Sequence, residues 1–289
     1  EFDGIIKIGR THLADATPLR LGQEIGGLGR QLELSVERAL RGAEAVLELP
    51  AGGTAVGSGI NTHPEFGARV AADLASQTDI GFVEAADHFE ANAQRDGLVE
   101  CHGQLKAIAS TLFNVSNNIR WLGAGPRCGF YEIKLPDRQP GSSIMPGKVN
   151  PVIPEAAAMV AAQVIGNDAT ITIAGQSGNF ELNVMLPLIA RNLLESISLL
   201  SKVSRLLADK AIATFTVRED QLTQALARNP ILVTALNPVI GYLKAAEIAK
   251  LAYKEGRPIV DVAAEHTDLS RDELERLLNP AKLTHGGIE

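Results

Sequence analysis

Apolar residues recur every three or four positions over long stretches of this chain, the spacing that places them on one face of an α-helix. We therefore predict helices over residues of about 19–49, 64–76, 98–122, 150–173 and 186–207. Long helices with such apolar stripes and few internal breaks are typical of a helical bundle. The pattern predicts an all-α fold with a core of long packed helices.

After about residue 215 the predicted helices become shorter. Asn-Pro pairs punctuate this part at 229–230, 237–238 and 279–280. Ser270, followed three residues later by Glu273, fits a capping box at a helix start. We predict a central bundle domain over residues 1–217 and a small, separate helical domain over residues 218–289.

The amino-acid composition excludes some classes of binding partner and indicates the cellular compartment. Of the 289 residues 45% are hydrophobic and only 4% aromatic, which favours packed helices over a sandwich or barrel. A net charge of −7 without a long Lys/Arg block argues against nucleic acid or an anionic membrane as a partner. No run of about 18 apolar residues is present, so we expect no membrane span. Two cysteines are too few for a disulfide framework, and we expect a cytoplasmic protein, or a mitochondrial-matrix protein in a eukaryote.

Residues 141–151 read Gly-Ser-Ser-Ile-Met-Pro-Gly-Lys-Val-Asn-Pro and are the segment richest in candidate chemistry. Asn150 is suited to cap a helix, and Pro151 fits the first helical position, where no N–H is needed. The Lys148 ammonium, the Asn150 amide, loop N–H groups and the positive end of the helix dipole would together favour a carboxylate. Such donors would also stabilise a serine alkoxide in a dry site. The segment therefore predicts proton abstraction from a carbon beside a carboxylate.

A second polar cluster lies in residues 9–18, where His12 is surrounded by Arg10, Thr11 and Asp15. Taken alone, His12 is interpreted as a hydrogen-bonded surface or core histidine. Glu155, in the first turn of the helix predicted after Asn150, is interpreted in the same way as a complement to the helix dipole. If the two are paired, Glu155 would instead orient the His12 imidazole and stabilise its charged form.

Two other features are interpreted as structural. The Gly-rich residues 52–61 lack the Gly-Lys-Ser/Thr ending of a phosphate-binding loop, so we expect tightly packed backbone there. The five other histidines show no metal-ligand spacing, and we expect them to be structural or solvated: His63, His88, His102, His266 and His285. The sequence thus predicts neither a metal site nor an organic cofactor.

The loop at 141–151 resembles the signature loop of the fumarase/aspartase superfamily. Residues 9–18, followed by Leu-Gly-Gln-Glu at 21–24, resemble its second active-site stretch, and segments at 53–61, 125–128 and 178–183 resemble those of fumarases. Within the superfamily the chain looks most like class II fumarases. It has His12 where aspartases usually carry Gln, and Gly147 where they often carry Ala. Residues 152–155, Val-Ile-Pro-Glu, look at least as much like aspartase.

The resemblance implies a lyase that interconverts fumarate and (S)-malate without metal or cofactor. It implies Ser142 as the base that takes the C3 proton of malate, and His12 with Glu155 as the pair that handles the proton of the water at C2. It also implies a set of groups that hold the substrate carboxylates and the intermediate: Thr11, Ser143, Lys148, the Val149 backbone and Asn150.

Members of the superfamily carry an additional N-terminal domain and build each site from three subunits of a homotetramer. Nothing in this sequence matches that domain, so we expect it to be absent from the chain and the site to be incomplete. Two alternatives stay open. An aspartate ammonia-lyase would require ammonia for turnover, and a non-catalytic helical assembly module would form tetramers without turnover.

Overall fold

The computed structural model describes residues 1–285 and 287, and it confirms the predicted all-α class. The chain divides into two compact units, each described by itself. The bundle unit consists of Arg30–Trp121 and Leu135–Phe215, and the hairpin unit of Glu1–Gly29, Leu122–Lys134 and Thr216–Glu289. The last part of the chain therefore groups with two earlier segments, whereas the sequence analysis treats residues 218–289 as a domain of their own.

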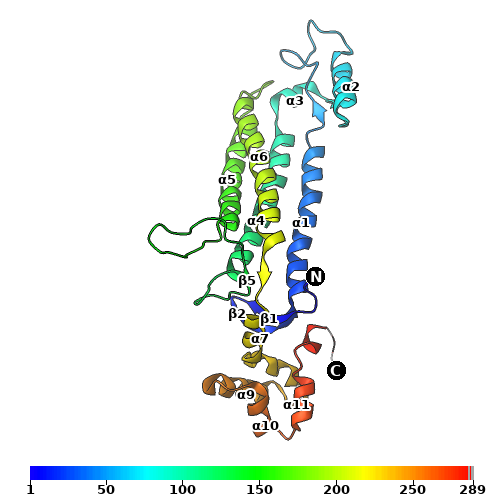
Figure 1. Ribbon diagram of the computed structural model, residues 1–289. Coiled ribbons are helices and arrows are strands. Elements are labelled where there is room, and N and C mark those ends of the chain that lie inside the picture. Colours follow the sequence, from blue (N-terminus) through cyan, green and yellow to red (C-terminus); the bar gives the residue numbers. More distant parts are fainter. Residues whose placement is uncertain (286, 288–289) are drawn as a thin grey trace. The chain divides into compact units, whose positions relative to one another are not determined.

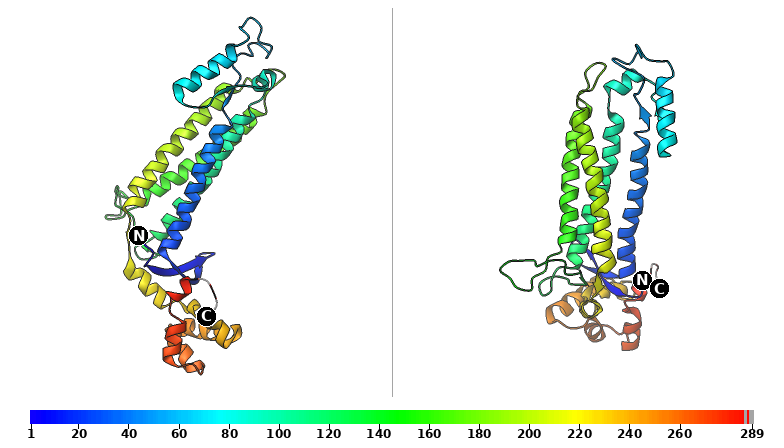
Figure 2. Two further views of the ribbon diagram at one scale, coloured as in Figure 1. Left: turned by 90° about the vertical axis from the view of Figure 1, so that its right-hand side faces the viewer. Right: turned by 45° about the horizontal axis from the view of Figure 1, so that its top comes forward.

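Long helices run side by side through the bundle unit (Figures 1 and 2). They are α4 (Asp96–Leu122), α5 (Val152–Gly175), α6 (Leu186–Lys210) and the greater part of α1 (Leu21–Glu44). A short 3-10 helix, η1 (Ile212–Thr214), follows α6. Each long helix lies where the sequence predicts one. The largest difference is at the end of α1, which stops at Glu44 rather than near residue 49.

Small and branched apolar side chains fill the space between α4, α5 and α6. A buried cluster joins Cys101, Ile171, Ala174, Ile189 and Leu193. Gly175 allows an especially close approach of two helices, because a Cβ atom at this position would lie 2.4 Å from Cγ2 of Val99 on α4. The core therefore depends on small side chains along α5 as much as on large ones.

Short elements connect α1 to α4. The strands β3 (Glu48–Leu49) and β4 (Val83–Glu84) pair in parallel, and α2 (Phe66–Thr78) lies on the helix predicted at 64–76. The helix α3 (His88–Ala93) has no counterpart in the sequence prediction. The Gly-rich residues 52–61 pack closely, since a Cβ atom on Gly57 would lie 2.8 Å from the Phe89 ring.

The hairpin unit contains an antiparallel pair of strands, β1 (Ile6–Thr11) and β2 (Ala14–Arg20), which the sequence analysis does not predict. Lys7 of β1 is fully buried, and its ammonium lies 2.6 Å from Oε2 of Glu24 and 2.8 Å from Oε2 of Glu132. Arg10 pairs with Glu132 as well, and its guanidinium carbon lies 3.9 Å from the centre of the Phe130 ring. The buried carboxylate of Glu132 and the partly exposed one of Glu24 thus compensate the charge of the buried Lys7. A charged residue at a buried position also hides the alternation of polar and apolar residues by which a strand is predicted.

The rest of the hairpin unit is built from short elements. They are β5 (Ile133–Lys134), which pairs with β6 (Thr216–Val217), then α7 (Glu219–Ala227), η2 (Pro230–Leu236), α8 (Asn237–Ile240), α9 (Tyr242–Glu255), α10 (Ile259–His266), α11 (Arg271–Leu277) and η3 (Lys282–Thr284). Leu236, Ile248 and Leu274 belong to its apolar core. The hydroxyl of Ser270 accepts a hydrogen bond from the Glu273 N–H at 3.3 Å, which confirms the helix start predicted for α11.

The helix α5 differs from expectation in one respect. Among the described residues it alone is long and apolar enough, by length and composition, to cross a membrane, although the sequence analysis expects no such stretch. Its polar residues Asn167 and Asp168 are buried and hydrogen-bonded to α6 and α4. An apolar helix with internal polar residues matched to its neighbours has the character of a core helix in a bundle.

Candidate active site

The predicted base, Ser142, lies half-buried in the loop that precedes α5. Its Oγ accepts two backbone hydrogen bonds, from the N–H of Ile144 at 3.3 Å and from that of Met145 at 3.1 Å. Both donors are peptide groups and carry no proton that they could give up at neutral pH. They would stabilise negative charge on this oxygen, which is the condition for a serine to act as a base.

Two hydrogen bonds close the loop on itself. The Gly141 N–H donates to the Lys148 carbonyl at 2.7 Å, and the Asn150 side-chain amide donates to the Gly141 carbonyl at 3.0 Å. Gly141 is needed at this point, because a Cβ atom there would lie 2.8 Å from the Lys148 carbonyl oxygen. The two hydrogen bonds therefore join the two ends of the loop, Gly141 and Lys148–Asn150, directly before α5 begins.

The role predicted for Asn150 as a helix cap is wrong. The helix begins at Val152, its capping position is Pro151, and no side chain among the described residues caps it. The Asn150 amide is already engaged with the Gly141 carbonyl, so it closes the loop instead. In the first turn the Val152 N–H donates to the Asn150 carbonyl at 2.9 Å and Pro154 has no N–H, so the helix dipole rather than a row of free N–H groups would favour an anion here.

Several predicted site residues meet in one open pocket of about 410 Å³ beside this loop. Ser142, Lys148 and Val149 line it. Lys148 and Val149 are exposed, as is Ser143 next to Ser142. Glu155 is half-buried in the first turn of α5, where a carboxylate complements the helix dipole. Lys148 and Ser142 bring a cation and a hydroxyl together in this pocket, a combination suited to a carboxylate.

Arg138, which lines the same pocket, is a residue that sequence reasoning missed. Its guanidinium donates to the Lys210 carbonyl at 3.1 and 2.9 Å and to the Thr214 hydroxyl at 3.2 Å. These contacts tie the loop to the C-terminal end of α6, where a cation is favourable. No local signal in the sequence points to these contacts, because Asp137 directly before Arg138 offers a nearer carboxylate.

Thr11 and His12 lie in the hairpin unit, at the exposed tip of the β1–β2 hairpin. Both central residues of the turn, His12 and Leu13, have positive φ angles of 54° and 61°. Positive φ at both central residues is what a two-residue type I′ hairpin turn requires, and it is uncommon for a residue such as Leu13. The structure thus places His12 in one unit and Ser142, Glu155 and Lys148 in the other.

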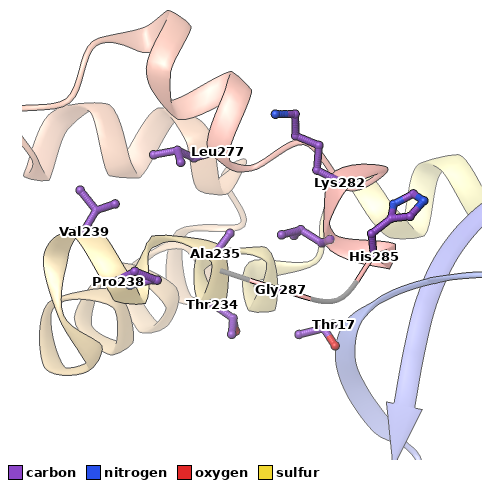
Figure 3. Close-up of a pocket in the computed structure, with 10 residues that line it drawn as sticks. Thr17, Thr234, Ala235, Pro238, Val239, Leu277, Lys282, His285 and Gly287 are labelled. Atoms are coloured by element: carbon purple, nitrogen blue, oxygen red, sulfur yellow. The ribbon is translucent and has the colours of Figure 1, made fainter. Parts of the chain in front are cut away.

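A separate pocket of about 360 Å³ lies within the hairpin unit (Figure 3). Thr17, Thr234, Lys282 and His285 contribute to its wall, and none of the predicted site residues does. Among residues 1–285 and 287, no group of three or more His, Cys, Asp or Glu side chains gathers in a way that could hold a metal ion.

Long helices packed side by side, with a polar loop directly before one of them, define a helical-bundle class of protein. The family model described as lyase matches residues 1–166, and the chain belongs to this lyase family. A second model, described as the C-terminus of fumarase C, matches residues 232–285.

Individual relatives agree with the family. A class II fumarate hydratase of Pseudomonas aeruginosa is 59% identical over the whole chain and 63% of its own length. A class II fumarate hydratase of Xylella fastidiosa is 55% identical over 98% of the chain and 60% of its own length. The crystal structure of recombinant class II fumarase from Schistosoma mansoni superposes with a TM-score of 0.93, at 34% identity, over 98% of this chain and 62% of that one.

These similarities confirm the resemblance to class II fumarases that the sequence motifs suggest. The chain spans about three fifths of the length of the relatives that it matches.

Proposed function

We propose that the protein containing this chain catalyses the reversible addition of water to fumarate to give (S)-malate. The observation that carries the proposal is the pair of peptide N–H groups on the Ser142 oxygen, in a loop with Lys148 at the foot of α5. The names of the relatives from Pseudomonas aeruginosa and Xylella fastidiosa support the choice of substrate.

In the dehydration direction, Ser142 as its alkoxide takes the proton from C3 of malate. The electron pair of the broken C–H bond moves into the adjacent carboxylate and gives an aci-carboxylate dianion. Lys148, the loop N–H groups and the positive end of α5 stabilise this added charge. Ser143, the second N–H of the Asn150 amide and the Val149 backbone also bind the two carboxylates, together with Thr11 of the hairpin unit.

The hydroxyl group at C2 leaves in the second step. His12 as an acid gives it a proton, so that water departs as the C2–C3 double bond of fumarate forms. Glu155 stabilises the charged imidazole. In the hydration direction each group reverses its role, and the Ser142 hydroxyl returns its proton to C3.

We propose further that the site is completed in a homotetramer. Large apolar side chains are exposed on the long helices of the bundle unit: Val36 (63%), Leu40 (62%), Met159 (70%), Ile173 (61%) and Leu194 (66%). Apolar stripes of this extent on neighbouring helices are typical of surfaces that pack against other subunits.

The direct test is the ultraviolet absorbance of fumarate in ammonia-free buffer, with the full-length protein. We expect fumarate to be consumed and malate to appear in equal amount. Consumption only after ammonia is added would replace the proposal with an aspartate ammonia-lyase. A tetramer that turns over fumarate under neither condition would indicate a non-catalytic assembly module.

A further inference from the structure

A buried polar network crosses the interior of the bundle unit, and the proposed mechanism does not use it. His102 on α4 is fully buried, with Nδ1 3.0 Å from Oδ1 of Asp168 on α5 and Nε2 2.9 Å from the hydroxyl of Ser196 on α6. Lys106, one turn after His102, lies 2.6 Å from the other Asp168 oxygen. The network therefore connects three different helices through one imidazole ring.

The hydrogen bonds of this network have a consistent direction. The Gln163 amide donates to the Asn167 side-chain oxygen at 2.8 Å, and the Asn167 amide donates to the Ser196 hydroxyl at 3.1 Å. The Asp168 carboxylate can only accept, so Nδ1 of His102 carries a proton and donates to it. A serine hydroxyl has one proton and two lone pairs, so Ser196 can accept from the Asn167 amide and donate to Nε2 of His102. Each of these groups is satisfied by a neighbour on a helix.

The order serine, histidine, aspartate with these distances is also that of a hydrolytic triad. A hydrolytic role is ruled out by burial, because Ser196 and His102 have no exposed surface and Asp168 is 7% exposed. None of the three lines any of the pockets described among residues 1–285 and 287. A catalytic nucleophile must be accessible from a substrate-binding pocket, and Ser196 is not, so the network has a different role.

Its position on α5 points to that role. Asp168 follows Glu155 by thirteen residues on the same uninterrupted helix, which corresponds to a rise of about 20 Å and a rotation of about 140° around the axis. The network therefore holds the inner face of α5, while Glu155 and the loop at 141–151 are carried at its N-terminal end. Apolar contacts between Ala, Val and Ile side chains allow small rotations, whereas directional hydrogen bonds fix one.

We propose that His102, Asp168 and Ser196 are positioning residues that fix the rotation and axial position of α5, and through it the position of Glu155. The proposal rests on the role given to Glu155 in the proposed function. A displacement of about 1 Å at a reacting group can lower a rate by about a hundredfold. Loss of the network should therefore reduce kcat although none of its members touches the substrate.

The test uses Ser196→Ala in the full-length protein, with Ser201→Ala on the exposed face of α6 as the matched control. We expect Ser196→Ala to lower kcat about tenfold to a hundredfold and to leave KM within about twofold. In a Glu155→Gln background, where the positioned group is already missing, the same change should alter kcat by less than about twofold. Ser201→Ala should have no effect in either background.

Amide hydrogen exchange gives a second readout that does not depend on activity. Ser196→Ala should speed exchange in peptides covering residues 141–160, which contain the loop and the N-terminal end of α5, and Ser201→Ala should not. If Ser196→Ala does not fold, Ser196→Cys keeps a weaker donor of similar size and should show the same effects to a smaller degree.

Several results would overturn the positioning role. They are an unchanged kcat in Ser196→Ala, an equal loss of kcat with and without Glu155, or exchange that is faster only near residue 196. An enzyme without fumarate turnover would refute the proposed function instead, and the exchange experiment would still decide whether the network holds α5.

Discussion

At the scale of single residues, the proposed chemistry depends on what surrounds one oxygen atom. Ser142 is placed where two peptide N–H groups reach its Oγ, and no basic side chain is hydrogen-bonded to it among the described residues. Peptide donors stabilise an alkoxide without competing for the proton. The basicity proposed for Ser142 thus depends on the loop conformation, which Gly141 and Asn150 maintain.

Ser142→Ala removes the oxygen that would take the C3 proton. A well-placed acid or base contributes roughly 10²–10⁴-fold to a rate, or about 3–5 kcal/mol of the barrier, and kcat should fall by that factor. Steady-state fumarate hydration measures it. Ser143→Ala is the neighbouring control and should act mainly on KM, because Ser143 is assigned to carboxylate binding. Wild-type kcat in Ser142→Ala would remove this serine from the mechanism.

The residues of the loop could be predicted from sequence, because a lysine, an asparagine and two serines near a helix start are a local signal. The partners of Lys7 and His102 could not. Lys7 pairs with Glu132, which lies 125 positions away, and His102 contacts Ser196 at a separation of 94 residues. Nothing in the neighbouring sequence distinguishes such residues from solvated ones.

At the scale of elements, the long helices were predictable and the short ones were not. The stripe of apolar residues in α4 and α6 repeats over many turns, so a few exceptions do not hide it. The helix α5 is apolar around most of its circumference, and the Asn-Pro pair at 150–151 marks where it starts. The β1–β2 hairpin has too few residues for such averaging, and its buried Lys7 and exposed turn at His12 both depart from simple alternation. The helix α3 is only six residues long and depends on its cap, Asp87.

The cap of α11 gives a measurable prediction for one element. The Ser270 hydroxyl accepts from the Glu273 N–H at 3.3 Å, and this bond satisfies a donor that the helix itself leaves free. Ser270→Ala should therefore lower the free energy of unfolding by about 1 kcal/mol. Denaturant unfolding measures it, and the exposed Ser201→Ala serves as the control. Equal stability of the two variants would show that the cap contributes nothing.

Asp168 links α5 to α4 in a pH-dependent way. Burial raises the pKa of this carboxyl group, but hydrogen bonds from Lys106 and His102 outweigh it, and the pKa lies below the ordinary value. A lowered pKa in the folded state means that ionised Asp168 stabilises the fold above the unfolded pKa, near 3.9. This stability is lost as the pH falls through the lower, folded pKa.

Asp168→Asn should therefore destabilise the protein most at neutral pH. The difference in unfolding free energy from the wild type should narrow from about pH 4 downward, because this carboxyl group binds a proton in the unfolded wild type there and in the folded wild type at lower pH, while the amide does not titrate. Denaturant midpoints between pH 7 and the acid limit of folding test this. The exposed Asp209→Asn on α6 is the control. A difference that stays constant over this range would contradict the assigned cause.

At the scale of the whole molecule, the proposed site residues are divided between the two compact units. Ser142, Lys148 and Glu155 belong to the bundle unit, and Thr11 and His12 to the hairpin unit. The exposed apolar stripes of the long helices support assembly with other copies of the chain. If a site takes His12 from one subunit and Ser142 from another, two inactive variants can complement each other.

Mixing His12→Asn with Ser142→Ala tests this arrangement. Each variant alone should lose roughly 10²–10⁴-fold in kcat, because every site lacks one of the two groups. After joint unfolding and refolding in equal amounts, random tetramers should contain about one quarter of sites with both native residues, and activity should return to about that fraction. Mixing without subunit exchange is the control and should restore nothing. If His12 and Ser142 of one site came from the same subunit, refolding together would also restore nothing, because every chain carries one defect.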